Sequence, residues 1–288
     1  MKARRSCLSV PGSSESMLAK AAGLGADELV LDLEDSVAPA AKQDARTLVG
    51  NVLDRGVLAG APVAVRVNGI EGPWFADDVS ELAGRGIGSV VVPKIERPQD
   101  LDRVASLLDS LGAPAADVRI QALVETARGL MRAGEIASAT PRLEALILGY
   151  ADLAASLARP PGSDRPEIWL YAQETVLVAA RAAGLQAIDG PYLAIRDEDG
   201  LRTRAEHVRA LGFDGKWAVH PAQVPVINAV FTPPAEEFER ATAIVAALER
   251  AEQDETAGAT ELNGQMIDEA SRKLALHTVA RGRAAGLA

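Results

Sequence analysis

The sequence has few of the residues that support disulfides, zinc sites or membrane insertion. Its 288 residues include one cysteine, Cys7, so a disulfide within the chain is excluded, and the three histidines do not have the spacing of a zinc site. The apolar stretch after MKARRS is too short for a signal-peptide core, and no run reaches the about 18 apolar residues of a membrane span. We therefore expect a cytoplasmic protein without a membrane partner.

Aromatic side chains and net positive charge are also scarce. Aromatics make up 3% of the residues against 48% hydrophobic residues overall, so Ala, Val, Leu and Ile must fill the core. The formal net charge of −10 gives no global attraction for nucleic acid, and an anionic ligand would need a local basic pocket.

Short apolar runs recur along the chain, each followed by a stretch with helical spacing. The spacing of the runs averages about thirty residues, which is close to one βα unit. Eight such units predict an α/β fold, a (β/α)8 (TIM) barrel over residues 1–232. The expected strands are residues 6–10, 28–33, 63–67, 89–93, 119–124, 145–149, 185–189 and 216–220. A doubly wound open sheet is the competing architecture, but no strand is followed by a GxGxxG turn.

The pattern changes after the eighth strand. Pro233 and Pro234 break the chain, and two helical stretches follow, separated by the Gly-containing residues 255–264. These features predict a C-terminal helical extension over residues 233–288 that has no sheet of its own. We expect this extension to act as a lid on the barrel or as an arm that reaches a neighbouring subunit.

Barrel enzymes carry their catalytic groups at the C-terminal ends of the strands. Glu125 ends the fifth expected strand and Asp152 the sixth, so adjacent strands about 4.8 Å apart can aim both carboxylates at one point. Mg2+ prefers such hard oxygen ligands, with water and substrate oxygens completing its shell. The alternative is that each carboxylate caps a helix or pairs with a nearby arginine.

Other polar residues fall at the same end of the barrel. Arg66 is expected to face carboxylates such as Glu34 and Asp35, or a substrate oxyanion, because an unpaired buried charge is costly. Lys94 could form a Schiff base, but nearby acids should keep it protonated and favour an electrostatic role. His220 is more typical of a hydrogen-bonded rim residue than of a general base.

Seven motifs in this order resemble the citrate lyase β-subunit-like family of CoA-ester lyases, within the HpcH/HpaI aldolase superfamily. They are LSVPGSSESMLAKA, LVLDLEDSV, VRVNG, VVPKIE, ALVETARGL, GYADLAASL and AVHPAQV. The resemblance covers about residues 5 to 270. It implies a (β/α)8 barrel with a C-terminal extension that assembles as a homo-oligomer, a trimer in preference to a hexamer.

The resemblance also implies residue roles. Glu125 and Asp152 would be the Mg2+ ligands, with Mn2+ as a possible substitute, and Asp152 would also help to bind substrate. Arg66 would act in catalysis and bind the oxygens of the 2-oxo or hydroxy acid. Glu34, also a catalytic residue, and Asp35, also a substrate-binding one, would support Arg66 and metal-bound water. The late segment LNGQMIDEA is similar to a stretch of the family's extension and indicates a catalytic role for Asp268, which would reach the active site of an adjacent subunit and move a proton there. Without the resemblance, the sequence predicts that Asp268 is the N-terminal residue of a helix.

The chain departs from the family pattern in two loops. A basic residue usual after PGS is replaced by Ser14 and Glu15, which leaves Lys20, Lys42 and Arg46 as candidates for contacts with the CoA phosphates. Tyr150 and Ala151 precede Asp152 where many relatives have Ala-Glu, so the shape of the substrate pocket should differ.

The expected activity is a reversible Claisen-type cleavage of a carboxylated 3-hydroxyacyl-CoA, such as malyl-CoA or citramalyl-CoA, into an acyl-CoA and a 2-oxo acid. Three alternatives remain open. They are a citrate lyase β subunit that acts on a carrier-bound thioester, a CoA-independent metal aldolase, and a non-catalytic barrel that binds an oxo acid or a protein.

Overall fold

The computed structural model describes residues 3–160, 162, 165–253 and 259–288. The chain divides into two compact units, Arg4–Asn228 and Ala229–Ala288, the second of which also includes the N-terminal end of the chain. The division falls inside helix α10 (Gln223–Phe231). The boundary expected after residue 232 stays a prediction.

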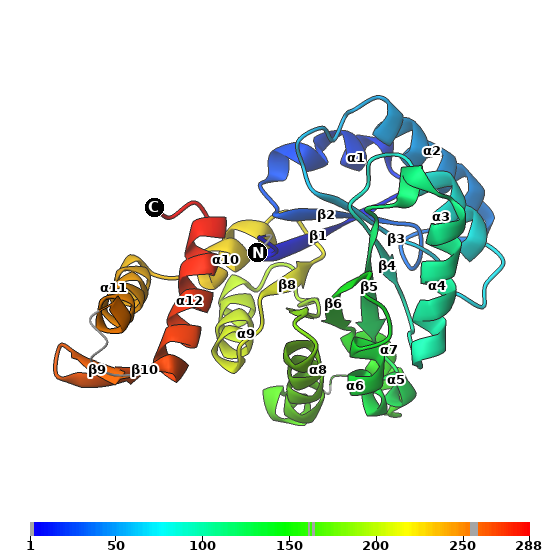
Figure 1. The fold of residues 1–288 in the computed structure, drawn as a ribbon. Coiled ribbons are helices and arrows are strands. Elements are labelled where there is room, and N and C mark those ends of the chain that lie inside the picture. The colour runs from blue at the N-terminus through cyan, green and yellow to red at the C-terminus, as the bar shows by residue number, and fades with distance from the viewer. Residues whose placement is uncertain (1–2, 161, 163–164, 254–258) are drawn as a thin grey trace. The chain divides into compact units, whose positions relative to one another are not determined.

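Eight parallel strands close into a barrel in the first unit, as the sequence predicted (Figure 1). Each strand pairs with the next one along the chain, and the last pairs with the first. The strands are β1 (Ser6–Pro11), β2 (Glu28–Asp32), β3 (Val63–Arg66), β4 (Ser89–Val92), β5 (Arg119–Val124), β6 (Leu143–Leu148), β7 (Gln186–Asp189) and β8 (Gly215–Ala218).

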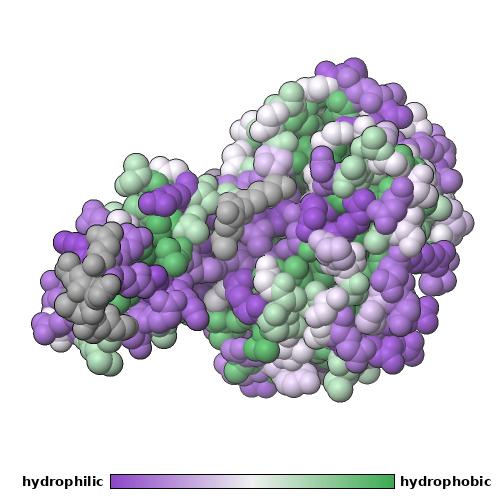
Figure 2. Space-filling view, in the orientation of Figure 1, coloured by the Kyte–Doolittle hydropathy of each residue, from purple (hydrophilic) through white to green (hydrophobic). Residues whose placement is uncertain are grey.

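Helices connect the strands and lie around the barrel. The α-helices are α1 (Glu15–Ala21), α2 (Lys42–Asp54), α3 (Phe75–Leu82), α4 (Pro98–Ser110), α5 (Ala127–Met131), α6 (Ala133–Ala137), α7 (Tyr150–Ser156), α8 (Leu170–Ala182) and α9 (Glu198–Leu211). Short 3-10 turns are η1 (Ala22–Leu24), η2 (Pro39–Ala41), η3 (Ala113–Ala115) and η4 (Pro166–Ile168). On the face of the barrel unit that Figure 2 shows, hydrophilic residues cover much of the outer surface. Among the described helices, none is long and apolar enough to cross a membrane.

Local sequence explains where several helices begin. The Thr126 side chain accepts a hydrogen bond from the backbone N–H of Gly129 at 3.0 Å and so caps α5. Pro98 occupies the first turn of α4, where its missing N–H costs nothing. These starts matter for the site, because they fix the loops at the C-terminal ends of the strands.

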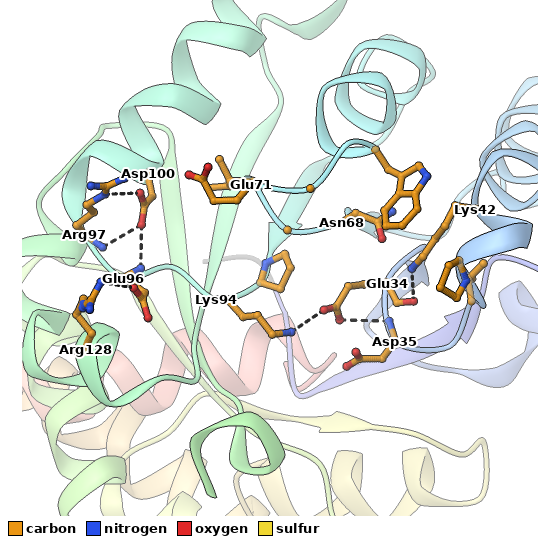
Figure 3. Close-up of a pocket in the computed structure, with 17 residues that line it drawn as sticks. Glu34, Asp35, Lys42, Asn68, Glu71, Lys94, Glu96, Arg97, Asp100 and Arg128 are labelled. Carbon is orange, nitrogen blue, oxygen red and sulfur yellow. Dashed lines mark hydrogen bonds and ion pairs between the residues drawn. The ribbon is translucent and has the colours of Figure 1, made fainter. Parts of the chain in front are cut away.

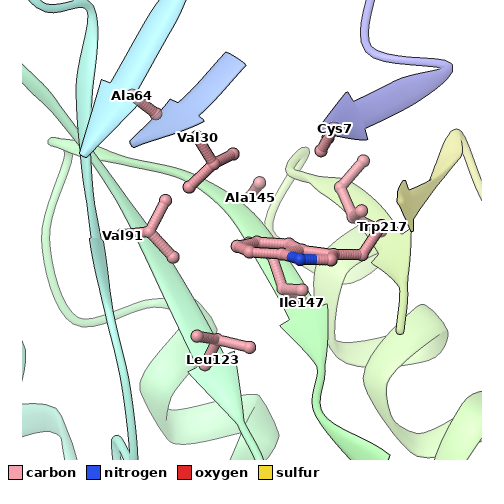
Figure 4. Packing of buried hydrophobic residues seen from close by; sticks show 9 residues of the cluster. Cys7, Val30, Ala64, Val91, Leu123, Ala145, Ile147 and Trp217 are labelled. Carbon is pink, nitrogen blue, oxygen red and sulfur yellow. The ribbon is translucent and has the colours of Figure 1, made fainter. Parts of the chain in front are cut away.

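Small and branched side chains fill the barrel interior around one large aromatic ring. Trp217 of β8 lies across the centre of this cluster (Figure 4). The rest of the cluster comes from all seven of the other strands: Cys7, Val30, Ala64, Val91, Leu123, Ala145, Ile147 and Ile188. The prediction that aliphatic residues fill the core is confirmed, with a single tryptophan closing the middle.

A buried ion-pair network lies near the N-terminal ends of the strands. Arg4 donates two hydrogen bonds of 3.0 Å to the carboxylate of Glu28, and both side chains have 0% exposure. Gln121 donates to the same carboxylate at 3.0 Å. Because a buried charge without its partner is expensive, removing one member of this network should be strongly destabilising.

The second unit contains two long helices and a β-hairpin. Helices α11 (Ala235–Gln253) and α12 (Glu269–Ala284) pack together around Phe238, and a Cβ on Gly282 would lie 2.2 Å from the Phe238 ring. Strands β9 (Ala259–Leu262) and β10 (Gln265–Asp268) pair antiparallel. The expectation that the extension has no sheet was therefore wrong.

The sequence did carry a signal for this hairpin. Asn263 and Gly264 join the two strands, and both have positive φ, 52° and 79°. An Asn-Gly pair between two strands is typical of a tight hairpin turn, because both residues tolerate the left-handed conformation. The predicted spacer over residues 255–264 is thus partly strand, and its residues 255–258 lie outside the described part of the chain.

Candidate active site

The predicted site residues of the barrel come from four consecutive strand ends. Arg66 ends β3, Lys94 follows β4, Glu125 follows β5 directly, and Asp152 lies in the first turn of α7 after β6. Parallel strands bring these positions to one edge of the barrel. Glu34 and Asp35, beyond the end of β2, extend the same cluster.

Arg66 is held by a carboxylate that sequence reasoning missed. Asp32 faces Arg66 in the β2–β3 register and accepts two hydrogen bonds from its guanidinium, each 2.7 Å long. Glu34 and Asp35 each have a carboxylate oxygen 3.3 Å from Arg66 Nη1. The guanidinium also lies 5.7 Å from the ring centre of Trp217. These carboxylates therefore hold the guanidinium of Arg66 in place, half-buried at the C-terminal end of β3.

The charge of Arg66 sets the ionisation of Asp32. Burial alone would raise the pKa of this carboxyl, but the hydrogen bonds and charge of Arg66 outweigh that effect and lower the pKa below its ordinary value. The pKa of Arg66 is raised in turn, because Asp32 outweighs the effect of burial on the guanidinium. The pair therefore stays ionised.

Lys94 joins the two predicted metal ligands. Its backbone N–H donates to Glu125 Oε1 at 2.9 Å, while its ammonium lies 2.7 Å from Glu34 Oε1 and 3.2 Å from Asp152 Oδ2. Its φ of 55° is in the left-handed region, which is strained for a residue with a side chain. Burial would lower the pKa of Lys94, but Glu34 and the other acids raise it above its ordinary value, which favours the protonated lysine expected from the sequence.

Glu125 is buried, and no neighbouring side chain fully neutralises the negative charge of its carboxylate. Its exposed fraction is 5%. Burial, with a smaller contribution from the charge of Asp152, raises the pKa of Glu125 to about 7 against the opposing charge of Lys94. A carboxylate in this position would gain from a divalent cation.

Gly149 makes room for the Glu125 carboxylate. A Cβ at this position would lie 2.3 Å from Glu125 Oε2, closer than any real contact. Within the described residues, no three His, Cys, Asp or Glu side chains form a metal cluster. Two carboxylates with open positions around them fit Mg2+, which commonly takes one or two carboxylates and completes its shell with water and substrate oxygens.

A cavity of about 740 Å3 lies beside this cluster (Figure 3). Lys94 reaches toward Glu34 on one side of it, and Arg128 pairs with Glu96 on the other, with an N–O distance of 3.1 Å. Arg97 also lines the cavity. Neither Arg97 nor Arg128 was among the basic residues expected from the sequence to contact CoA.

The three predicted CoA contacts have different surroundings. Lys42 lines the cavity, but its ammonium donates to the backbone carbonyls of Leu33 at 2.7 Å and Glu34 at 2.6 Å. Arg46 is buried and donates to Asp78 at 2.9 Å. Lys20 is exposed in the last turn of α1. The role of the three side chains in CoA binding stays a prediction.

Asp268 belongs to the second unit, where it caps a helix. Its carboxylate accepts hydrogen bonds from the backbone N–H of Ser271 at 2.9 Å and from the Ser271 hydroxyl at 3.0 Å. These hydrogen bonds lower the pKa of Asp268 below its ordinary value. The local expectation of a residue at a helix start is confirmed, and its catalytic role stays a prediction.

The comparisons with known proteins agree with the geometry. The model of the HpcH/HpaI aldolase/citrate lyase family matches residues 5–221. A (3S)-malyl-CoA thioesterase of Cereibacter sphaeroides is 40% identical over 97% of this chain and 95% of its own length. The citrate lyase subunit beta of Leuconostoc mesenteroides is 34% identical over 92% and 88%.

A solved structure is similar along nearly the whole chain. The protein CitE from Mycobacterium tuberculosis, in complex with magnesium, acetoacetate and coenzyme A, is 31% identical, with a TM-score of 0.75 over 98% of both chains. The match of the family model and the identity to full-length relatives lead to one conclusion: the chain belongs to the HpcH/HpaI aldolase/citrate lyase family.

Proposed function

We propose that the chain is a magnesium-dependent CoA-ester lyase that splits a carboxylated 3-hydroxyacyl-CoA into an acyl-CoA and a 2-oxo acid. The observation that carries the proposal is the convergence of Glu125, Asp152 and Arg66 at the mouth of the barrel. The names of the relatives, which include a malyl-CoA/beta-methylmalyl-CoA lyase and a citrate lyase subunit, support the same chemistry.

Each residue has a distinct part in this reaction. Glu125 and Asp152 would hold Mg2+, which when bound supplies a Lewis acid for the substrate carboxylate and the neighbouring oxygen. Arg66, fixed by Asp32, donates hydrogen bonds to the oxygen on which charge develops. The protonated Lys94 orients Glu34 and Asp152.

The reaction balances with two proton transfers. The substrate hydroxyl loses its proton, the bond between the hydroxyl carbon and the carbon next to the thioester carbonyl breaks, and that second carbon takes up a proton. We assign the second transfer to Asp268 of a neighbouring subunit. In the arrangement seen here its pKa is lowered, so the assignment requires that binding against a barrel desolvates Asp268 and raises its pKa.

Thioester hydrolysis is the second candidate, and the 40% identity to a (3S)-malyl-CoA thioesterase favours it. The two reactions leave different products from malyl-CoA. A lyase yields acetyl-CoA and glyoxylate, whereas a thioesterase yields free CoA and malate. Separation of the products by chromatography after incubation with Mg2+ decides between them, and glyoxylate trapped as its phenylhydrazone counts as evidence for the lyase alone.

We further propose a homo-oligomer, a trimer in preference to a hexamer, in which the extension of one chain completes the site of another. Mixing two inactive variants tests this arrangement. Glu125→Gln removes a metal ligand from the barrel and Asp268→Asn removes the proton carrier from the extension, so a mixed oligomer contains some sites with both residues intact. Activity that returns on mixing supports exchange between subunits; activity that never returns in proven mixed oligomers contradicts it.

Three points from the sequence are not tested by the geometry. A cytoplasmic location remains a prediction. The carrier-dependent alternative is tested by whether the purified chain cleaves free CoA thioesters, and the CoA-independent aldolase by whether CoA protects the chain from heat or proteolysis.

A further inference from the structure

Helix α7, which carries the candidate metal ligand Asp152, begins without a capping side chain. Gly149 occupies the position before the helix and has no side chain that could accept a hydrogen bond from the first turn. A larger residue is excluded there, because a Cβ would lie 2.3 Å from Glu125 Oε2. Other contacts therefore have to hold the backbone that carries Asp152.

Tyr150, the first residue of α7, borders a second cavity in the barrel unit. This cavity has a volume of about 410 Å3 and lies between the strands and helices α7, α8 and α9. None of the residues Arg66, Lys94, Glu125 and Asp152 lines it. Because one side of the Tyr150 ring faces this space, packing alone does not fix the ring.

Two buried charged residues line the same cavity. Asp189 of β7 lies opposite Lys216 of β8 in the strand register. Their neighbours Ile188 and Trp217 belong to the interior cluster, and side chains alternate along a strand, so the charged pair faces the helices. The exposed fractions of Asp189 and Lys216 are 1% and 2%. Apolar side chains often stabilise such a layer at least as well as a buried ion pair, so stability alone does not explain these two residues.

Hydrogen bonds connect this pair to the start of α7. The Lys216 ammonium donates to the Asp189 carboxylate and, at 2.6 Å, to the carbonyl of Gly190. Asp189 also accepts a hydrogen bond from the Tyr150 hydroxyl. The amide of Gln173 on α8 donates to the same hydroxyl at 2.7 Å. The hydroxyl thus uses its donor and one acceptor position, and a connected buried network of this kind favours one arrangement.

The ring of Tyr150 is also held along its edge. The ring centres of Tyr150 and Trp169 lie 4.8 Å apart, with an angle of 67° between the ring planes. This edge contact and the two hydrogen bonds at the hydroxyl restrain both ends of the side chain. Tyr150 therefore supplies the start of α7 with an anchor that a capping side chain supplies in other helices.

The anchor and the metal site share one turn of helix. Tyr150 and Asp152 both lie in the first turn of α7, and the Asp152 carboxylate is 3.2 Å from the Lys94 ammonium in the candidate metal site. Glu125 is placed separately, by β5 and by the backbone N–H of Lys94 at 2.9 Å. The distance between the two carboxylates therefore depends on the position of this turn. Mg2+ demands near-ideal octahedral geometry, so a small displacement of Asp152 weakens binding.

We propose that Tyr150 is a positioning residue for the metal site. Its hydroxyl anchors the first turn of α7 to the buried Asp189–Lys216 pair and so holds Asp152 at the distance from Glu125 that Mg2+ requires. The proposal rests on the proposed function, because that function assigns the metal to Glu125 and Asp152.

Calorimetric titration of the full-length protein with Mg2+ tests the effect on the metal. Tyr150→Phe keeps the ring and removes only the hydroxyl. Tyr171→Phe is the matched control, because Tyr171 also lies in the first turn of a helix, α8, but is 66% exposed. We expect the Mg2+ affinity to fall about tenfold in Tyr150→Phe, as for other residues that orient metal ligands, and to stay unchanged in Tyr171→Phe. Equal affinities of Tyr150→Phe and the wild type, or an equal fall in both variants, would overturn the proposal.

Hydrogen exchange followed by mass spectrometry in EDTA tests the anchor without the metal. In Tyr150→Phe the backbone amides of α7 should exchange at least about threefold faster than in the wild type, whereas those of α2 should keep their rates. Faster exchange throughout the chain would mean a general loss of stability, and unchanged exchange in α7 would mean that the hydroxyl anchors nothing. Either result would overturn the proposal.

The two measurements separate this proposal from the proposed function. A folded wild-type protein that binds no Mg2+ would overturn the proposed function and, with it, the effect of Tyr150 on the metal, while the exchange of α7 still decides whether Tyr150 anchors the helix. Mg2+ binding in the wild type that Tyr150→Phe leaves unchanged would overturn only the role of Tyr150. Circular dichroism of each variant checks that the fold is retained.

Discussion

Replacing Glu125 by glutamine should make the metal-free protein more stable at neutral and alkaline pH. Burial raises the pKa of Glu125 to about 7 from an ordinary value of 4.5. A raised folded-state pKa means that the folded chain binds the proton more tightly than the unfolded chain. The stabilisation that comes from this tighter proton binding is complete below pH 4.5 and is lost as the pH rises through about 7.

The size of the effect follows from the pKa difference. At about 1.4 kcal/mol per pKa unit, ionisation of Glu125 costs the wild type about 3 kcal/mol of unfolding free energy above pH 7. Glutamine keeps an oxygen that can accept the hydrogen bond from Lys94 N–H but carries no charge to bury. The variant should therefore approach the wild type in stability toward pH 4.5, and exceed it by a margin that grows up to about pH 7 and then levels off.

Urea denaturation in EDTA at pH 5, 6, 7 and 8, at one fixed protein concentration, measures this difference. Repeating the series in saturating Mg2+ should reverse the order, because the metal stabilises the wild type and leaves Glu125→Gln nearly unchanged. A stability difference in EDTA that does not vary with pH would refute the argument that Glu125 is buried as an uncompensated acid.

Three further substitutions test the geometry. Asp32→Asn should lower kcat/KM by about 10- to 100-fold, because Arg66 loses the charged partner that orients it, and steady-state kinetics with unchanged Mg2+ affinity would separate this effect from metal loss. Arg4→Met should lower the unfolding free energy by about 3 to 5 kcal/mol in urea denaturation, because the buried carboxylate of Glu28 loses its cationic partner; a loss under 1 kcal/mol would contradict this. Gly149→Ala should weaken Mg2+ binding more than tenfold by calorimetry, while Gly134→Ala, whose added Cβ meets nothing within 4 Å, should leave it unchanged.

The barrel could be predicted from the sequence because its signal is repeated and local. Eight apolar runs, each closed by polar or turn residues, define the strands to within a few residues, as with the expected strand 89–93 and the observed Ser89–Val92. The position of Glu125 and Asp152 after adjacent strands follows from the same counting. Strand order and shared strand ends are consequences of the barrel topology and need no knowledge of side-chain conformation.

Asp32 was missed because the sequence does not show which acid of a cluster faces the partner strand. LDLED contains three acids within four residues, and proximity to the loop favoured Glu34 and Asp35. The β2–β3 register instead places Asp32 opposite Arg66. A charged residue that ends an otherwise buried strand was the available signal.

Other features depend on contacts between distant segments. The left-handed backbone of Lys94 has no local sequence signature, since φ of 55° at a lysine is imposed by the surrounding structure. The cavity lined by Asp189 and Lys216 likewise has no local sequence signature, because its walls come from distant segments. Two charged residues within apolar strands could still have indicated a polar network between the barrel and its helices. The hairpin at Asn263 and Gly264 was readable from its turn residues alone.

The central claim is that the chain breaks a carbon–carbon bond with the help of a metal held by Glu125 and Asp152. The most direct test is the release of acetyl-CoA from malyl-CoA and citramalyl-CoA by the purified wild type and by Asp152→Asn, each with EDTA and with Mg2+. The account predicts acetyl-CoA release that disappears in EDTA, returns with Mg2+ and falls strongly in Asp152→Asn. Undiminished release in EDTA, or none from folded wild-type protein supplied with Mg2+, would contradict it.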